Sequence, residues 1–484
     1  MRLAPGIKCV HFLKFIIHRI TRPLKVAAGV LAFLVSASQL PGQPVTYEGY
    51  GYATHGGQGG DTYHVTTLAD GGAGSLRDGV VNRTGPRTIV FDVGGIIILT
   101  NTLALNRPYL TIDGGTAPAP GITVTKLSDT NQFFIAGTHD IILRHLRFVG
   151  LYPRGTTPGT SNTGIMGIDG DSSPDHYAHD LVVDHVTILN ATDAGLDIWG
   201  EVSDVTVSWC LIANCFHPST VSFYPAPFQK RRRISMHHNV WARNGERNPQ
   251  LRADVADFDY VNNIIYDWGY GVGGGYGVRI KNNAGEPKVN GNFVNNYFLA
   301  GALTPAWGLV YGADPGPDAE DLGPEATLPQ GTVVTNSAMG NLWVAGNILP
   351  AGNKDQYSTI PSPNPVPTNA QVTTYPALEL RDQVVPGVGM KYRSATEQAM
   401  LSEMVSAMAH PPELRMLSVT PTNCVLELNA PAGFQNELQF SDSLAPATWQ
   451  TLTNFAVNGD LVNITDALTG VSTRFYRVIT TEMY

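Results

Sequence analysis

A repeat of about 24 residues in the middle of the chain constrains the fold more than any other feature. Six segments share one pattern of apolar residues, then polar or aromatic residues, then a small residue or Asn: IILRHLRF (141–148), LVVDHVTI (181–188), VTVSWCLI (205–212), ISMHHNVW (234–241), FDYVNNII (258–265) and GNFVNNYF (291–298). Their third residues are separated by 40, 24, 29, 24 and 33 residues. A fixed base period with insertions indicates stacked structural repeats.

The last three repeats place an asparagine three residues after the aligned position, at Asn239, Asn263 and Asn296. Asparagines stacked on successive coils can hydrogen-bond through their amides, whereas isolated turn asparagines would share no register. An α/β sheet would need helices of about ten or more residues between its strands, and the sequence of this region has none. The pattern therefore predicts an all-β chain whose centre is a parallel β-solenoid.

Changes of composition on both sides of the repeats predict the domain boundaries. We expect core coils over 108–300, and SLRDGVVN (75–82) is a short helix candidate that would cap their open end. A loop-rich extension with an amphipathic helix at 394–408 follows, so the solenoid domain should span 46–410. Residues 412–484 resemble the short strands of a β-sandwich module, which serves either as a carbohydrate-binding module or as a spacer or sorting module.

The N-terminal residues have the composition of a targeting segment. Basic residues precede the apolar run VAAGVLAFLVSA (26–37), which is too short to span a bilayer comfortably and ends in a small-x-small cleavage pattern. We expect residues 1–37 to be a signal peptide, which makes the protein secreted or periplasmic, with no membrane span after cleavage. The alternative is that residues 9–36 act as an anchor.

Charge and cysteine content exclude some partners and cofactors. A net charge of −9 gives no general attraction to nucleic acid, and we expect a monomer without a nucleic-acid partner. Cys210, Cys215 and Cys424 lie in strand-like sequence without the spacing of zinc ligands. Buried thiols are the simpler interpretation, and a disulfide between Cys210 and Cys215 is the alternative in an exported protein.

The repeat register brings distant charged residues together. Residues at equal offsets stack about 4.8 Å apart on neighbouring coils, and Asp193, His217 and Arg247 have offsets of ten, ten and eleven from their register positions. Asp197 and Arg252 lie four and five residues further along their coils. Because unpaired charges are unfavourable in a core, these five side chains should face outward into a groove.

This set of residues suggests a chemistry. Two neighbouring carboxylates repel each other, and a hard cation such as Ca²⁺ would neutralise them and bridge to a carboxylate of a substrate. Arginines bind carboxylates through paired hydrogen bonds. A polyuronate has such carboxylates, and neutralising one makes the neighbouring C5 proton more acidic. Removal of that proton and loss of the C4 oxygen is a β-elimination, the reaction of a lyase.

Several segments carry a family resemblance: GYATHGGQGGDTYHVTTLADGGAGSLRD, FDVGGIIIL, VVDHVTI, DAGLDIWG, ISMHHNVWARNGERNPQLR and VNNIIYDW. From about residue 48 to 300 the chain resembles the pectate lyases of polysaccharide lyase family one. RNPQLR matches the family's R-x-P-x-x-R motif, and DAGLD matches its acidic segment before a strand. The resemblance implies a right-handed parallel β-helix, Ca²⁺ dependence and elimination of polygalacturonate, an acidic polysaccharide also called pectate.

The resemblance also implies roles for single residues. Arg247 matches the catalytic base and Arg252 the arginine that binds substrate, while Asp193 and Asp197 match calcium ligands. Arginine is an unusual base because it is protonated at neutral pH. Arg247 would therefore have to lose a proton in the substrate complex or pass protons through water.

The chain departs from the family pattern at two positions. The family's substrate-binding lysine is missing one coil before the arginine motif, where His217 or Lys230 could replace it; the alternative for His217 is a structural turn residue. A family aspartate is replaced by Gly164, and Asp169 or Asp171 could compensate as the third metal ligand. Weaker calcium binding or an altered substrate would follow.

Other interpretations stay open at the level of sequence. A solenoid glycoside hydrolase would use carboxylates alone and leave the arginines idle. A non-catalytic polyuronate-binding surface protein is favoured by the two departures. Asp184 and His185 are expected to support the fold, and KRRR (230–233) is either a patch that attracts a polyanion or a solvated turn.

Overall fold

A computed structural model describes most of the chain, namely residues 18–19, 46–127, 131–151, 164–170, 177–222, 232–252, 257–269, 277–281, 289–304, 311–314, 341–350, 371–409, 412–420, 422–430, 434–443, 447–456, 461–468 and 473–482. The chain divides into two compact units, residues 46–408 and residues 409–484 with 1–45.

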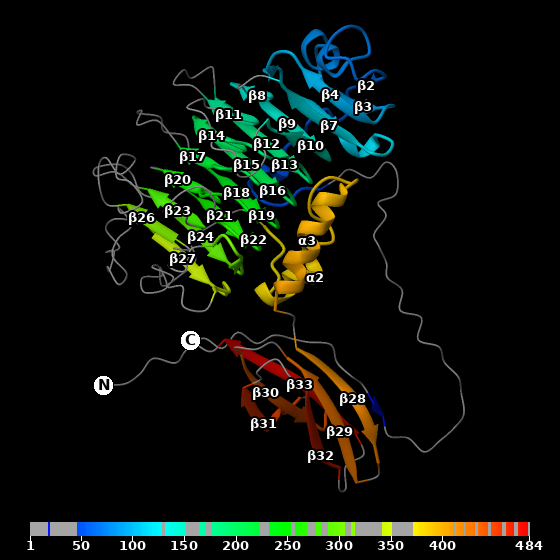
Figure 1. Cartoon of the computed structure of the whole chain (residues 1–484), viewed down its shortest axis with the longest axis vertical. Coiled ribbons are helices and arrows are strands. Elements are labelled where there is room, and N and C mark those ends of the chain that lie inside the picture. Colours follow the sequence, from blue (N-terminus) through cyan, green and yellow to red (C-terminus); the bar gives the residue numbers. More distant parts are fainter. Residues whose placement is uncertain are drawn as a thin grey trace. The chain divides into compact units, whose positions relative to one another are not determined.

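The larger unit is a right-handed parallel β-helix, in which each coil contributes one strand to each of three parallel sheets (Figure 1). Sheet 1 contains β2 (Asp61–Val65), β3 (Arg87–Phe91), β6 (Leu110–Asp113), β9 (His139–Arg144), β12 (Ala178–Asp184), β15 (Val202–Ser208), β18 (Ile234–His237), β21 (Phe258–Val261), β24 (Asn290–Val294) and β27 (Asn341–Ala345). Sheet 2 contains β4 (Gly95–Leu99), β7 (Ile122–Lys126), β10 (Leu146–Val149), β13 (Thr187–Leu189), β16 (Leu211–Ala213), β19 (Val240–Ala242), β22 (Ile264–Tyr266) and β25 (Tyr297–Leu299). Sheet 3 contains β5 (Leu103–Leu105), β8 (Phe133–Ala136), β11 (Met166–Gly170), β14 (Leu196–Gly200), β17 (Thr220–Ser222), β20 (Gln250–Arg252), β23 (Val278–Lys281) and β26 (Tyr311–Asp314). The expected fold class is confirmed.

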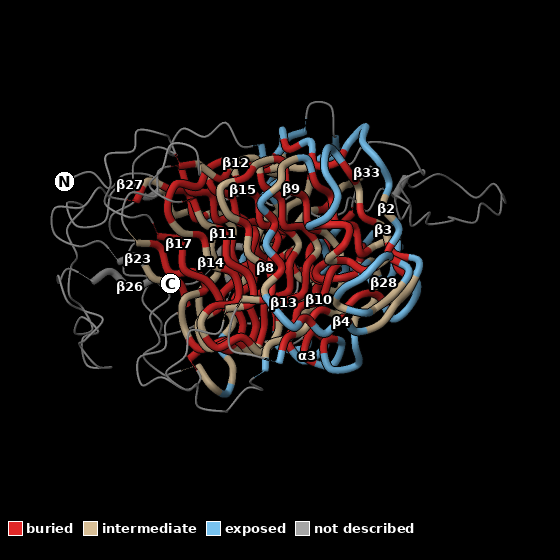
Figure 2. Tube along the Cα trace, turned by 90° about the horizontal axis from the view of Figure 1, so that it is seen from above, coloured by how far each residue is buried: buried red, intermediate tan, exposed pale blue. Residues whose placement is uncertain are grey.

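The pairing of sheet 1 follows the register of the sequence repeat. Val183 pairs with Val207, Val207 with Met236, and Met236 with Tyr260. All four are fully buried, and the interior of the stacked coils forms one apolar core (Figure 2). Burying a side chain of this size contributes about 1.5–3 kcal/mol. Coils of unequal length therefore keep the same register, because the insertions lie between the strands.

The asparagine column lies at the turn between sheet 1 and sheet 2. The Nδ2 atom of Asn239 donates to Oδ1 of Asn263 (3.0 Å), Asn263 donates to Asn296 (3.1 Å), and Asn296 donates to Asn347 (2.9 Å). The residue before each predicted asparagine has a left-handed backbone, as at His238 with φ 56°. This left-handed residue turns the side chain that follows it into the coil interior. The predicted stacking is confirmed, and Asn347 extends the column by one coil.

Segments outside the coils cover one end and two faces of the β-helix. The element η2 (Asp78–Asn82) packs against β2 and β5, the first strands of sheets 1 and 3, as expected for the predicted end cap. The backbone around η1 (Tyr50–Ala53) lies on the outside of sheet 1, where Tyr50 N donates to Ser235 Oγ (3.0 Å). The short elements η3 (Gly114–Thr116), η5 (Ala377–Glu379) and α2 (Leu380–Gln383) complete the connections.

The predicted amphipathic helix is α3 (Ala395–Ala407), which runs along sheet 2 (Figure 1). Ser394 caps its N-terminus, and the side chain of Glu397 reciprocates in a capping box. Glu397 is buried and forms an ion pair with Arg147 of β10 at 2.6 Å. At the other end of the helix, the Tyr266 hydroxyl of β22 donates to Glu403 (2.7 Å). These polar contacts fix the helix against coils that lie far apart in the sequence.

The smaller unit is a β-sandwich of antiparallel sheets, as expected for the C-terminal module. One sheet contains β28 (Glu413–Val419), β29 (Asn423–Asn429) and β32 (Val462–Ala467). The other contains β30 (Phe434–Ser441), β31 (Gln450–Ala456), β33 (Thr473–Glu482) and the two-residue strand β1 (His18–Arg19). Leu426, Leu428, Leu438 and Val478 form its own apolar core. Apart from β1, residues 1–37 lie outside the described part.

The cysteines are buried thiols, as the simpler interpretation of the sequence predicted. Cys210, Cys215 and Cys424 are all free, so the alternative of a Cys210–Cys215 disulfide does not apply. Burial raises the pKa of Cys215 to about 12, which leaves it protonated and unreactive.

The helices are short. Among the described residues, every helix is too short or too polar to cross a bilayer.

Candidate functional site

A groove of about 470 Å³ lies on the outer face of sheet 3, and most of its lining comes from β8, β11, β14 and the turns before them. Alternation along the strands explains its polarity, since on β14 Leu196 and Ile198 enter the core while Asp197 and Trp199 face outward. Its lining residues are Asn131, Phe134, Gly164, Met166, Gly167, Ile168, Asp169, Asp193, Ala194, Asp197, Trp199 and Arg247.

The structure brings the predicted charged residues Asp193, His217 and Arg247 together at one edge of this groove. Asp193 and His217 form a parallel β-bridge on neighbouring coils, and Ser219 N donates to the carbonyl oxygen of Arg247 (3.1 Å) on the next coil. Nδ1 of His217 lies 3.2 Å from Asp193 Oδ1. One guanidinium nitrogen of Arg247 lies 3.7 Å from the same oxygen. Residues at similar offsets in the sequence repeat are therefore in contact on neighbouring coils.

Glu246 is a member of this cluster that sequence reasoning missed. Its Oε1 lies 3.2 Å from His217 Nε2 and 3.6 Å from Arg247 Nε. Burial would raise the pKa of Glu246, but the contact and charge of His217 outweigh burial and hold the pKa below its usual value. The signal available in the sequence was its place directly before Arg247, one coil after His217.

His217 is held between two carboxylates and does not line the groove. Burial would lower its pKa, but the contacts with Asp193 and Glu246 outweigh burial and raise it. The imidazole links the coil of Asp193 to the coil of Glu246, and when protonated it partly neutralises both acids. Because both ring nitrogens face protein carboxylates, the geometry favours the structural alternative over direct contact with substrate.

Asp197 has a different environment from Asp193, although both line the groove. Thr220 N donates to Asp197 Oδ1 (2.6 Å) and Trp199 Nε1 donates to Oδ2 (3.1 Å). Burial and, to a smaller extent, the nearby charge of Asp193 nevertheless raise the pKa of Asp197 to about 7. For Asp193, burial is outweighed by His217 and Arg247, and the pKa is lowered. The two carboxyl groups therefore titrate far apart.

Arg247 faces the groove from a left-handed backbone position with φ 63°. This conformation is uncommon for a residue with a side chain. Its guanidinium lies near Asp193, near Glu246 and 3.5 Å from the hydroxyl of Thr220. The side chain is four-fifths buried. A cation held this way is positioned at the groove before any substrate arrives.

The other predicted site residues lie outside the cluster of Asp193, His217, Glu246 and Arg247. Arg252 pairs with Ser222 in sheet 3, and Ser222 pairs with Trp199, so Arg252 lies in the outward column that continues Asp169 and Trp199 beyond the groove. Asp169 lines the groove itself. Lys230 and Asp171 lie outside the described residues. Their roles therefore stay predictions from the sequence.

Two basic residues of the KRRR run differ from both sequence interpretations. Arg232 is buried and forms an ion pair with Glu201 at 2.7 Å. Arg233 forms an ion pair with Asp204. Neither is a free cation for a polyanion or a solvated turn residue, because each neutralises a carboxylate, Glu201 in the turn before β15 and Asp204 on β15.

Asp184 and His185, predicted to support the fold, lie at the end of β12 and in the turn after it. Asp184 is buried and contacts His185 Nδ1 (2.7 Å) and Ser208 Oγ (2.7 Å). The contact with Ser208 joins one coil to the next, which agrees with a structural role.

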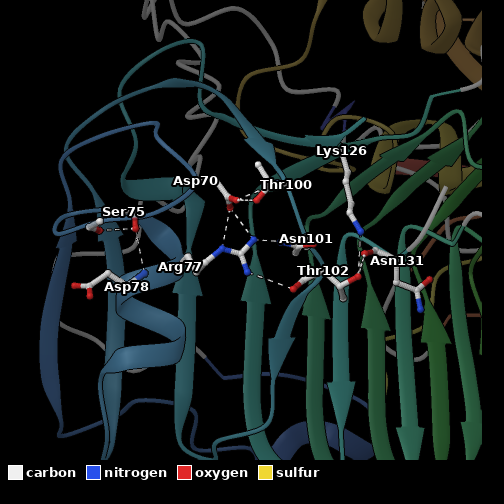
Figure 3. A network of polar contacts seen from close by, with 10 residues as sticks. Asp70, Ser75, Arg77, Asp78, Thr100, Asn101, Thr102, Lys126 and Asn131 are labelled. Carbon is white, nitrogen blue, oxygen red and sulfur yellow. Dashed lines mark hydrogen bonds and ion pairs between the residues drawn. The ribbon is translucent and has the colours of Figure 1, made fainter. Parts of the chain in front are cut away.

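Asn131 lies against Gly164, the position at which the family resemblance predicts an aspartate. A Cβ atom at Gly164 would lie 2.0 Å from Asn131 Oδ1, so a larger residue there would require this amide to move. Figure 3 shows Asn131 at the end of a polar network; its backbone carbonyl accepts from Thr102 Oγ1 (2.7 Å), which accepts from Lys126 Nζ (3.2 Å). The network continues on the N-terminal side with the ion pair of Asp70 and Arg77 (Figure 3).

The donor set of the groove suits a hard cation in its chemistry. Asp193, Asp197 and the amide of Asn131 all offer oxygen, the ligand that calcium prefers. A cation would also relieve the unfavourable burial of a charged Asp197. Among the described residues, the groove aspartates do not form a group of three ligand atoms within 4.8 Å of one another. Two carboxylates, one amide oxygen and oxygens of water or substrate would have to complete the shell.

Curated relatives of this chain are named as pectate lyases, although no family model matches it. "Probable pectate lyase C" of Aspergillus flavus is 33% identical over 287 residues, which cover 59% of this chain and 60% of that protein. "Pectate lyase 4" of Ambrosia artemisiifolia is 27% identical over 278 residues, which cover 54% of this chain and 66% of that protein. The chain thus spans about 60% of the length of the first of these relatives. The resemblance seen in the motifs is confirmed over that length.

A solved structure agrees on the fold. The crystal structure of jun a 1, the major allergen from cedar pollen, matches with a TM-score of 0.51 at 17% identity. The match covers 71% of this chain and 92% of the allergen chain. At this identity the likeness concerns architecture, and it supports the same parallel β-helix.

Proposed function

We propose that the protein is a polysaccharide lyase that cleaves polygalacturonate by β-elimination with the help of Ca²⁺. The observation that supports this most strongly is the position of Arg247, an oriented cation in a groove that also contains two carboxylates of very different pKa. The names of the relatives point to the same reaction.

Asp193, Asp197 and Asn131 would hold the cation. When bound, Ca²⁺ neutralises the substrate carboxylate and so makes the C5 proton of the sugar more acidic. The contacts of Asp193 with His217 and Arg247 keep this carboxylate charged and oriented, so it is ready as a ligand. Asp197 becomes a ligand only as its proton leaves, because its pKa lies near 7.

Arg247 would then take the C5 proton. The C5–H bond breaks, its electron pair forms the C4–C5 double bond, and the C4–O bond breaks as its oxygen takes up a proton. Arginine is protonated in water, so Arg247 must first release a proton to water or substrate. Glu246 and Asp193 hold the guanidinium in place through contacts at 3.6 and 3.7 Å. Arg252, further along the same face, would bind a second substrate carboxylate.

A glycoside hydrolase remains the second candidate because one observation favours it. Asp193 has a lowered pKa and Asp197 a pKa raised to about 7. A pair of carboxyl groups with separated pKa values is what acid and base catalysis of glycoside hydrolysis requires. Under this hypothesis Arg247 would only bind substrate.

Product chemistry separates the two candidates. Incubation of the full chain with polygalacturonate is followed by two signals, the ultraviolet absorbance of the unsaturated product and the formation of reducing ends. We expect both signals to rise in a constant ratio. Reducing ends without absorbance would establish hydrolysis, and binding to the polymer without either signal would leave a non-catalytic binding protein.

We also propose that the protein is exported, since a polymeric substrate must be met outside the cell. The apolar run at 26–37 with its cleavage pattern supports this proposal. N-terminal sequencing of protein collected from the growth medium or periplasm should begin near residue 38. A mature protein that starts at Met1 and stays with the membrane would instead support an anchor.

A further inference from the structure

A second cluster of metal-ligating side chains lies on the outside of sheet 1, whereas the groove lies on sheet 3. Glu48, His237 and His238 each offer a ligand atom, and the three atoms lie within 4.8 Å of one another. His237 ends β18, and His238 is the left-handed residue of the following turn. Glu48 comes from the N-terminal segment that crosses the outside of the same sheet, where its carbonyl accepts from Thr206 Oγ1 (3.0 Å).

The two histidines are almost completely buried. Each is 1% exposed, and within the described part of the chain the Nε2 atoms of both rings make no hydrogen bond. Their Nδ1 atoms lie 2.8 Å apart, so one of them carries a proton and the other accepts it. Two buried imidazoles with unused nitrogens are unfavourable in a fold unless another group satisfies them.

The surroundings fix the orientation of His238. Its ring stacks on Trp209 with 4.7 Å between centroids and meets the edge of Tyr375 at 5.6 Å. An imidazole that is held in one orientation can present the lone pair of a ring nitrogen to a metal.

We propose that Glu48, His237 and His238 bind a divalent transition metal of the Zn²⁺ class. Two imidazoles and one carboxylate form a donor set suited to zinc, whereas calcium prefers oxygen alone. The site is therefore chemically distinct from the cation site proposed in the groove, and it does not depend on the proposed lyase activity.

The metal has a structural role at this position. Thr373 N donates to Glu48 Oε2 (2.8 Å), so Glu48 already connects the N-terminal segment to the segment around residue 373. A metal on Glu48 joins both segments to the turn after β18, which immediately precedes the asparagine column at Asn239. The metal would therefore cross-link Glu48 and His237, which are 189 positions apart in the sequence.

The test is a zinc titration of the full chain after removal of metals with a chelator. We expect the wild type to bind one equivalent of Zn²⁺ by calorimetry and to melt at a higher temperature when it is bound. Glu48→Gln keeps the size of the side chain and should weaken binding by about 10-fold or more, as loss of a partner at a metal site does. The matched control is His64→Gln, which removes an exposed histidine that contacts Asp92 at 2.9 Å, and it should bind zinc like the wild type.

Three results would overturn the proposal. They are the absence of zinc binding by the wild type, equal binding by Glu48→Gln and His64→Gln, and loss of binding in Asp197→Asn, which would place the zinc in the groove. Should Glu48→Gln fail to fold, the test is Co²⁺ in the wild type. Visible absorption bands of a four- or five-coordinate ion with histidine ligands would support the site, and the spectrum of hydrated Co²⁺ would contradict it.

Discussion

The asparagine column and the charged groove are built by the same stacking of coils, yet they behave in opposite ways. In the column, identical neutral amides pair with one another, and Asn263 both accepts from Asn239 and donates to Asn296. In the groove, unlike charged groups meet, and the pKa of Asp197 rises to about 7. The column satisfies its own polar groups, whereas the groove leaves a carboxyl group whose charge needs an external partner.

The difference shows what a coil repeat can be used for. A neutral pair needs no counter-ion, so it can repeat along the axis and contribute only stability. A charged group loses hydration on burial, and partners from neighbouring coils must compensate it. Substitutions in the column should therefore change stability and those in the groove should change activity.

The largest effect is expected for Arg247→Ala. We expect turnover of polygalacturonate to fall by about 10³-fold or more, equivalent to roughly 4 kcal/mol of transition-state stabilisation. The melting temperature should stay within about 3 °C of the wild type, because the contacts of Arg247 with Asp193 and Glu246 are long. Initial rates and thermal melts check both expectations. Activity within a factor of about two of the wild type would exclude Arg247 as the base.

Asn263→Ala should give the converse result. The substitution leaves the backbone N–H of Asn239 and the carbonyl of Met236 without their partners inside the core. Each lost partner costs about 1–3 kcal/mol, so the free energy of unfolding should fall by about 3 kcal/mol. Denaturant titration measures it, and Asn436, also buried but in the separate C-terminal unit, offers a control site where Asn436→Ala should leave the β-helix transition unchanged. A stable Asn263→Ala protein would mean that water replaces the amide.

Asp197→Asn tests the electrostatics of the groove through pH. The folded pKa of about 7 exceeds the unfolded value of 3.8, so the folded state binds more protons between these values. Stability of the calcium-free protein should therefore fall as pH rises from about 4 to 7, and Asp197→Asn should remove this part of the fall. Adding Ca²⁺ at pH 8 should restore stability to the wild type and not to the variant. If the stability of both proteins changed with pH in the same way, Asp197 would not have a raised pKa in the folded state.

The smallest effect is expected for Arg252→Ala. Arg252 lies beyond the groove in the column that contains Trp199 and Ser222, so it should bind substrate without touching the reacting atoms. We expect KM to rise by about 10-fold, or 1.4 kcal/mol, with a small change in kcat. Arg415→Ala, an exposed change in the C-terminal module, is the control. A fall in kcat at constant KM would place Arg252 in the reaction itself.

The β-helix could be predicted from the sequence because its register is local. The spacings of the repeat predicted that Val183, Val207 and Met236 pair in neighbouring strands, and that Asp193 meets His217. Asn347 was missed because 51 residues separate it from Asn296, and such an insertion hides the period. Glu246 was missed although it has the same offset of ten as Asp193 and His217, because attention went to Arg247 at offset eleven, the first arginine of the R-x-P-x-x-R motif.

Contacts between distant segments could not be predicted. Nothing in the sequence indicates that Tyr50 reaches Ser235, 185 residues away, or that Glu48 lies beside His237. Asn131 also escaped prediction, because its amide enters the groove only where Gly164 leaves space. These contacts depend on side-chain shape and on how loops return to the coils, and neither leaves a periodic signal. Periodicity predicted the scaffold, whereas the remaining parts of the site depend on packing.

The most direct test of the proposed lyase function is the rate of unsaturated product formation from polygalacturonate at fixed pH, measured in Ca²⁺, after chelation and after Ca²⁺ is restored. We predict that the ultraviolet signal appears with Ca²⁺, disappears on chelation and returns, because Asp193 and Asp197 need the cation to engage a substrate carboxylate. An equal rate in chelator, or no unsaturated product under any of these conditions, would contradict the proposal.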